Sequence, residues 1–132
     1  MTDEPHVVVS SAPHKDSAAA RRAAADFLAQ HCPWADKDAV LLVVTELVTN
    51  ALRHTTGWWR LHLTVRDREL VVEMDDSSPR PPVPRRPDFA GGGGFGWQMV
   101  QRLAGRVEVK SLPEGKRVAA TWLRPVPSLA TG

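Results

Sequence analysis

The chain has 132 residues, of which 42% are hydrophobic and 24% charged, a composition typical of one soluble domain with a single core. No apolar run could cross a membrane, no secretory signal opens the chain, and the single Cys32 excludes an internal disulfide, so we expect a cytoplasmic protein. The isoelectric point of about 9.1 reflects a net charge of only +2 in a chain without tyrosine, and does not indicate a nucleic-acid-binding protein.

Hydrophobic periodicity predicts one strand and two helices in the first half of the chain. The strand is "HVVVS" at residues 6–10. An alanine-rich helix follows over residues 15–32 and ends where Pro33 follows. Asp36 is placed to cap a second helix over residues 37–55.

The second half of the chain predicts a hairpin, a long loop, a short helix and a second hairpin. The predicted helix occupies residues 97–105. The predicted strands occupy residues 59–65, 70–76, 106–110 and 117–123. Residues 77–93 lack periodicity and contain five of the 11 prolines, so they are predicted to form a loop. Loops of this length inside a compact domain are usually functional or disordered.

This order of elements favours a two-layer α/β sandwich. Neighbouring strands with helices gathered to one side predict a mixed, mostly antiparallel sheet with the helices on one face. A doubly wound parallel sheet would need stricter alternation of strands and helices, so "GGGGFG" is not a dinucleotide-binding motif here. We expect a single domain over residues 1–132, with a core at 7–123 and a frayed tail at 125–132.

The predicted second helix carries an unusual group of polar residues beside its apolar stripe. Glu46 and Asn50 lie four residues apart, about one helical turn, so a carboxylate and an amide share a face. Arg53 continues this face, whereas His54 is offset from it. Taken alone, these residues are explained by a solvated helix face, so their interpretation depends on the rest of the chain.

Two further features point to a bound anion. Asp76 has the same strand parity as Val72 and Met74, which turns it towards the layer between sheet and helices, where a carboxylate needs a donor. Asp75, and Asp76 taken alone, can also be read as turn residues that end a hairpin. The glycine-rich segment 91–96 opens a helix and offers free backbone N–H groups to phosphate.

A nucleotide would use all of these features together. An inward carboxylate can accept a hydrogen bond from the exocyclic amine of adenine, and a glycine-rich helix start can hold phosphates. A carboxamide oxygen can coordinate Mg²⁺, which prefers oxygen ligands. A glutamate one turn earlier can orient or deprotonate a nucleophile.

These segments resemble the nucleotide-binding motifs of the Bergerat-fold (GHKL) ATPases. "ELVTNALRH" at 46–54 resembles their N-box, "VEMDDSSP" at 72–79 their G1 box, and "GGGFGWQMV" at 92–100 their G2 box. The order and spacing of the three boxes match as well. Within this family the chain is most similar to the small stand-alone histidine-kinase-like ATPases that act as anti-sigma-factor serine kinases.

The resemblance implies ATP and Mg²⁺ as cofactors and gives individual residues a role. It makes Glu46 the general base, Asn50 the Mg²⁺ ligand and Asp76 the carboxylate that reads adenine. The other nucleotide-binding positions that it implies are Arg53, Ser78, Gly94, Phe95 and Gly96. The loop 77–93 becomes the ATP lid.

The resemblance also implies a function and its partners. The chain would phosphorylate a serine on an antagonist protein, would bind a sigma factor, and could form a homodimer, with no role for nucleic acid or a membrane. The rival interpretation is a regulator that binds nucleotide, or none, and acts by protein–protein contact alone. A nucleic-acid-binding protein is a third interpretation, which rests only on the isoelectric point and the arginines of the loop.

Two departures from the family pattern separate these interpretations. Ser77, Ser78 and Pro79 follow the aspartate where the family usually has glycine. Later, Gly115-Lys116-Arg117 stands where such proteins often have Gly-Thr. These departures favour the non-catalytic regulator, whereas the retained Glu46 favours the kinase, because a protein that only binds nucleotide needs no general base.

Overall fold

The computed structural model describes residues 4–10, 17–54, 57–79 and 96–125. The elements in these ranges are β1 (His6–Ser10), α1 (Ser17–His31), α2 (Lys37–His54), β2 (Trp59–Arg66), β3 (Glu69–Asp76), α3 (Gly96–Leu103), β4 (Arg106–Leu112) and β5 (Gly115–Leu123). Every strand and helix predicted from the sequence is therefore present. The predicted lid, apart from residues 77–79, and most of the predicted tail lie outside the described residues.

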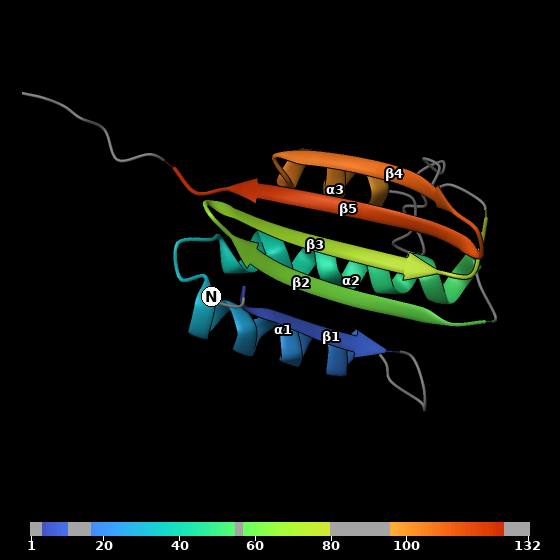
Figure 1. The fold of residues 1–132 in the computed structure, drawn as a ribbon, viewed down its shortest axis with the longest axis horizontal. Coiled ribbons are helices and arrows are strands. Elements are labelled where there is room, and N and C mark those ends of the chain that lie inside the picture. Colours follow the sequence, from blue (N-terminus) through green and yellow to red (C-terminus); the bar gives the residue numbers. More distant parts are fainter. Residues whose placement is uncertain (1–3, 11–16, 55–56, 80–95, 126–132) are drawn as a thin grey trace, which may run out of the picture.

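The strands form one sheet in the order β1-β2-β3-β5-β4, and the described helices all lie against the same face of it (Figure 1). The predicted two-layer α/β sandwich is confirmed. Each pairing between the described strands is antiparallel, so the sheet in this part of the chain lacks the parallel pair that a mixed sheet would contain. The central strand is β3, between β2 and β5.

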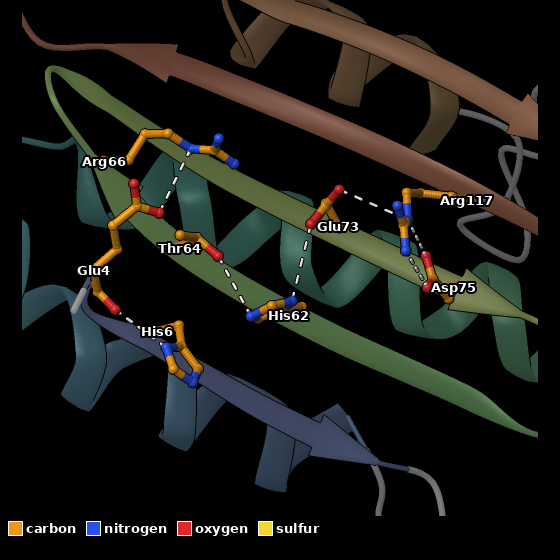
Figure 2. Close-up of polar contacts among 8 residues, drawn as sticks. All are labelled: Glu4, His6, His62, Thr64, Arg66, Glu73, Asp75 and Arg117. Atoms are coloured by element: carbon orange, nitrogen blue, oxygen red, sulfur yellow. Dashed lines mark hydrogen bonds and ion pairs between the residues drawn. The ribbon is translucent and has the colours of Figure 1, made fainter.

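Alternation of apolar and polar residues orients β2 and β3 in the sheet. Leu63, Val72 and Met74 face the helices and are at most 1% exposed, because successive side chains of a strand point to opposite faces. The opposite face is polar, and hydrogen bonds and ion pairs link its side chains across neighbouring strands (Figure 2). Asp67 has a φ angle of 50° in the turn between β2 and β3, a left-handed conformation that aspartate tolerates.

The second helix, α2, is fixed at its start and along its apolar face. The backbone N–H of Ala39 donates to Oδ1 of Asp36 at 3.2 Å, which confirms Asp36 as the predicted cap. The residues of α2 that are at most 2% exposed are Val40, Val43, Val44, Leu47, Val48 and Ala51. Their helical spacing fills the layer beneath the sheet and leaves the polar residues of the same helix to one side.

The lone cysteine, Cys32, is a core residue just beyond α1. Its side chain is 1% exposed, and this burial raises the pKa of the thiol to about 11, despite a backbone hydrogen bond from Ala35 that lowers it. A buried thiol with so high a pKa is a poor nucleophile at neutral pH, because the thiolate is the reactive form.

We expect Cys32 to report on unfolding. At pH 8 a disulfide reagent should leave the native thiol unmodified and should label it quickly in denaturant. Because the folded-state pKa of about 11 exceeds the reference value of 9.0, this thiol's contribution to stability is complete below about pH 9 and is lost as the pH rises towards 11. Urea unfolding at pH 8 and pH 10.5 should show this loss in wild type, and Cys32→Ala should lack that component. Fast labelling of the native protein would contradict the assignment.

Candidate nucleotide site

The polar face of α2 lies where the sequence predicts it. Glu46 and Asn50 are both half-buried, one turn apart, beside the buried Leu47. Within the described parts of the chain, neither side chain makes a hydrogen bond or an ion pair. Arg53, one turn further on, is exposed. The carboxylate and the amide are therefore sheltered from solvent without being satisfied by the described residues.

The last residue of β3, Asp76, points into the layer between sheet and helices, as its strand parity predicts. Its residue exposure is 2%, and it is neither a turn residue nor a solvated one. The backbone N–H of Ser78 donates to its Oδ1 at 2.9 Å, and Ser78 is itself buried. The predicted nucleotide-binding residues Asp76 and Ser78 thus lie together.

A residue to which the sequence reasoning gave no role completes this arrangement. Lys116 faces Asp76 directly across the β3–β5 pairing, and its Nζ donates to both carboxylate oxygens at 3.0 Å. Lys116 is only 5% exposed, so the two form a buried ion pair. The donor that an inward carboxylate needs is therefore supplied by β5.

The start of β5 is held unusually close to the end of β3. A Cβ atom added at Gly115 would lie 1.8 Å from the carbonyl oxygen of Asp76, so only glycine fits at this position. This approach brings Lys116 to the level of Asp76 without a bulge in either strand. The close approach of the two backbones therefore explains why residue 115 is glycine.

The two halves of the candidate site lie at one end of the sandwich. The end of α2 is joined to Trp59, the first residue of β2, by a short connection, and Trp59 pairs with Asp76. The end of β3 and the start of β5 consequently lie at the same end of the sheet as the final turns of α2 (Figure 1). The helix face of Glu46 and Asn50 and the buried Asp76 share this end of the molecule.

Most of the chain matches a known protein family. A profile described as histidine kinase-like ATPase domain matches residues 9–122. The chain belongs to the histidine kinase-like ATPase family. The resemblance to GHKL ATPases is thereby confirmed at the level of the family.

A solved structure and the curated sequences add to this comparison. The NMR structure of the histidine kinase domain of the E. coli osmosensor EnvZ matches with 22% sequence identity and a TM-score of 0.50, over 74% of this chain and 71% of that chain. At this identity the likeness concerns the fold. No curated protein sequence matches the chain.

The segment predicted to bind phosphate in this ATPase domain lies only partly within the described residues. Gly96 is the first residue of α3, one residue before the predicted start of this helix, whereas Gly94 and Phe95 lie outside the described residues. Helix α3 packs against α2 and β4, and the indole N–H of Trp122 donates to the carbonyl oxygen of Leu103 at 2.9 Å. The helix whose start is predicted to face phosphate is therefore anchored to the sheet at its other end.

The neighbour of Asp76 has a structural role on the other face of the ATPase domain. Asp75 lies within β3, not in a turn, and accepts hydrogen bonds from Arg117 Nε at 2.7 Å and Nη2 at 2.9 Å (Figure 2). These bonds are the main cause of a raised pKa for Arg117, which Glu73 raises further. Two adjacent aspartates thus point to opposite faces, and only Asp76 belongs to the candidate site.

The described residues of this ATPase domain include no group of three or more histidine, cysteine, aspartate or glutamate side chains arranged to hold a metal ion. None of the described helices combines the length and the apolar composition that crossing a membrane requires. The side chain of His54, which the sequence places off the face of Glu46 and Asn50, lies outside the described residues.

Proposed function

We propose that the chain binds Mg·ATP between α2 and the inner face of the sheet and acts as a protein-serine kinase of the anti-sigma-factor type. The observation that carries this proposal is the pair Glu46 and Asn50, half-buried and unsatisfied among the described residues, at the end of the sandwich where Asp76 is buried. Membership of the histidine kinase-like ATPase family supports ATP as the ligand.

Asn50 is the residue that would hold Mg²⁺. Its amide oxygen has no hydrogen-bond partner among the described residues, and one protein oxygen suits an ion that keeps several waters and takes further ligands from phosphates. When bound, Mg²⁺ neutralises phosphate charge. The remaining phosphate contacts are assigned to Arg53, Gly94, Phe95 and Gly96.

Glu46 and Asp76 have separate roles at the two ends of the nucleotide. Glu46, one turn before Asn50, accepts the proton of the partner's serine hydroxyl and so prepares the oxygen that attacks the γ-phosphate. Asp76, with Ser78 beside it, faces the base and accepts a hydrogen bond from the amine of adenine. Catalysis in such a site rests mainly on positioning and on neutralisation of charge.

The partners of the proposed kinase are an antagonist protein with the target serine and a sigma factor. Both follow from the resemblance of the N-box, G1 and G2 segments to anti-sigma-factor kinases, as does a homodimer, whereas the cytoplasmic location is proposed from the composition and the single cysteine.

A second candidate function is favoured by the Asp76–Lys116 ion pair. A regulator that acts only by protein–protein contact binds nucleotide weakly or not at all. Such a protein needs no accessible carboxylate where the adenine would bind. In such a protein the buried pair would be a structural element of the β3–β5 pairing. The unsatisfied Glu46 argues for the kinase, since a pure contact protein has no use for it.

Phosphate transfer separates the two candidates. With γ-labelled Mg·ATP and purified serine-bearing antagonists, wild type should place acid-stable label on a serine, because a phosphoserine survives the acid that hydrolyses phosphohistidine. Calorimetry on the same preparation should show saturable binding of Mg·ATP. Binding without transfer to any antagonist would favour the contact regulator, and the absence of both would reject the nucleotide site.

A further inference from the structure

The part of the proposed site that would bind adenine already contains a cation, the ammonium group of Lys116. Lys116 Nζ lies 3.0 Å from each oxygen of Asp76, and Ser78 N lies 2.9 Å from Oδ1. A carboxylate has about four lone-pair positions, and these contacts use three of them. The amine of adenine would have to compete for the carboxylate that the proposed function assigns to it.

The competition is unequal in charge. Lysine brings a full positive charge to Asp76, whereas the amine of adenine is neutral, so only the lysine contact adds an attraction between opposite charges to its hydrogen bonds. Both partners are nearly inaccessible to water, at 5% and 2% exposure, so the ion pair is weakly screened. Opening it also leaves an ammonium that needs a new partner.

We propose that Lys116 is an internal competitor for the base, so that it, rather than Asp76 alone, sets the affinity and base specificity of the site. This inference rests on the proposed nucleotide site and goes beyond it. In the free protein Lys116 satisfies Asp76. Adenine must displace this ammonium or share the carboxylate with it, so the amine adds little net affinity in wild type.

The register of β5 against β3 makes residue 116 the one whose side chain can contact the Asp76 carboxylate. In β5, Lys116 and Val118 point to the inner face, and Arg117 points to the outer one, where it pairs with Asp75. The close approach of Gly115 to Asp76 keeps the inner position of residue 116 beside the carboxylate. A side chain at 116 that lacks the charge would leave Asp76 available to a base.

The first test is Lys116→Thr, which removes the ammonium and leaves a hydroxyl donor. Calorimetry with Mg·ATP should give a dissociation constant at least about tenfold below that of wild type. Lys110→Thr is the matched control, because Lys110 is exposed on β4 and should leave the affinity unchanged. Lys116→Arg keeps the charge and should give no gain. Equal or weaker binding by Lys116→Thr would overturn the proposal.

A second test needs no variant and covers the case in which Lys116→Thr fails to fold. Wild type should bind the Mg²⁺ complex of purine riboside triphosphate, which lacks the 6-amine, within about threefold of Mg·ATP, because displacing Lys116 offsets the new hydrogen bond. A preference for ATP above about tenfold would mean that Asp76 reads the amine without competition, and would overturn the proposal while leaving the nucleotide site intact. If wild type binds neither nucleotide, both the competition by Lys116 and the nucleotide site are rejected.

Discussion

Replacing Glu46 by alanine should lower phosphate transfer to the antagonist serine by about 10²–10⁴-fold, the usual range for a lost general base, while ATP binding stays close to wild type. The reason is positional, because Glu46 is assigned to the nucleophile and Asn50 to the metal. Asn50→Ala should therefore weaken Mg·ATP binding and abolish transfer together. Single-turnover transfer and calorimetry on both variants measure the two effects separately.

Matched controls guard against general damage to the fold. Glu108→Ala removes an exposed glutamate on β4, and Gln30→Ala removes an exposed amide on α1, so both should transfer and bind as wild type does. Transfer by Glu46→Ala at the wild-type rate would contradict the role given to the helix face. Equal loss of ATP binding in Glu46→Ala and Asn50→Ala would show that the two residues do not act on different groups.

Asp76→Asn should destabilise the fold by about 3–5 kcal/mol, because it leaves the ammonium of Lys116 buried without its counter-ion. The loss of a single buried hydrogen bond to adenine would cost only about 1–3 kcal/mol of binding free energy. Because of the ion pair, Asp76→Asn should therefore affect the free energy of unfolding more than it affects nucleotide binding. Urea unfolding followed by circular dichroism measures the difference directly.

The adjacent residue provides the control for this second prediction. Asp75→Asn removes the same charge from the same strand, but its partner Arg117 has a side chain 39% exposed, so water can replace the lost contact and the destabilisation should be clearly smaller. The double variant Asp76→Leu with Lys116→Met should recover much of the stability, since apolar residues of similar size often replace a buried pair at little cost. Equal effects of Asp75→Asn and Asp76→Asn would be incompatible with a buried ion pair.

The sequence predicted the elements well because their signals are local. Strand parity alone turned Asp76 inward, and helical spacing alone placed Glu46 and Asn50 on one face. The requirement that an inward carboxylate have a donor was also readable, since it depends only on burial. What was not readable was the donor, because both a nucleotide and a side chain satisfy the same requirement.

The identity of that donor depends on a pairing between distant segments. Lys116 and Asp76 are 40 residues apart, and they meet only because β5 pairs with β3 in one register. Strand parity with Val118, Ala120 and Trp122 turns Lys116 inward, but only the register of the β3–β5 pairing decides which residue of β3 it faces. The same pairing moved Asp75 from a turn, as one interpretation had it, to a cross-strand partner of Arg117.

The close approach of Gly115 to Asp76 has a consequence for how this protein can evolve. The absence of a side chain at residue 115 allows the two backbones to approach, and this does not depend on which side chain stands at residue 116. Lysine and threonine codons differ by a single base, so under the proposed competition one point mutation separates a weak nucleotide site from a strong one. Selection could thus adjust how much of the protein carries nucleotide at a given ATP concentration through one codon, while the fold that presents the site to its partners stays the same.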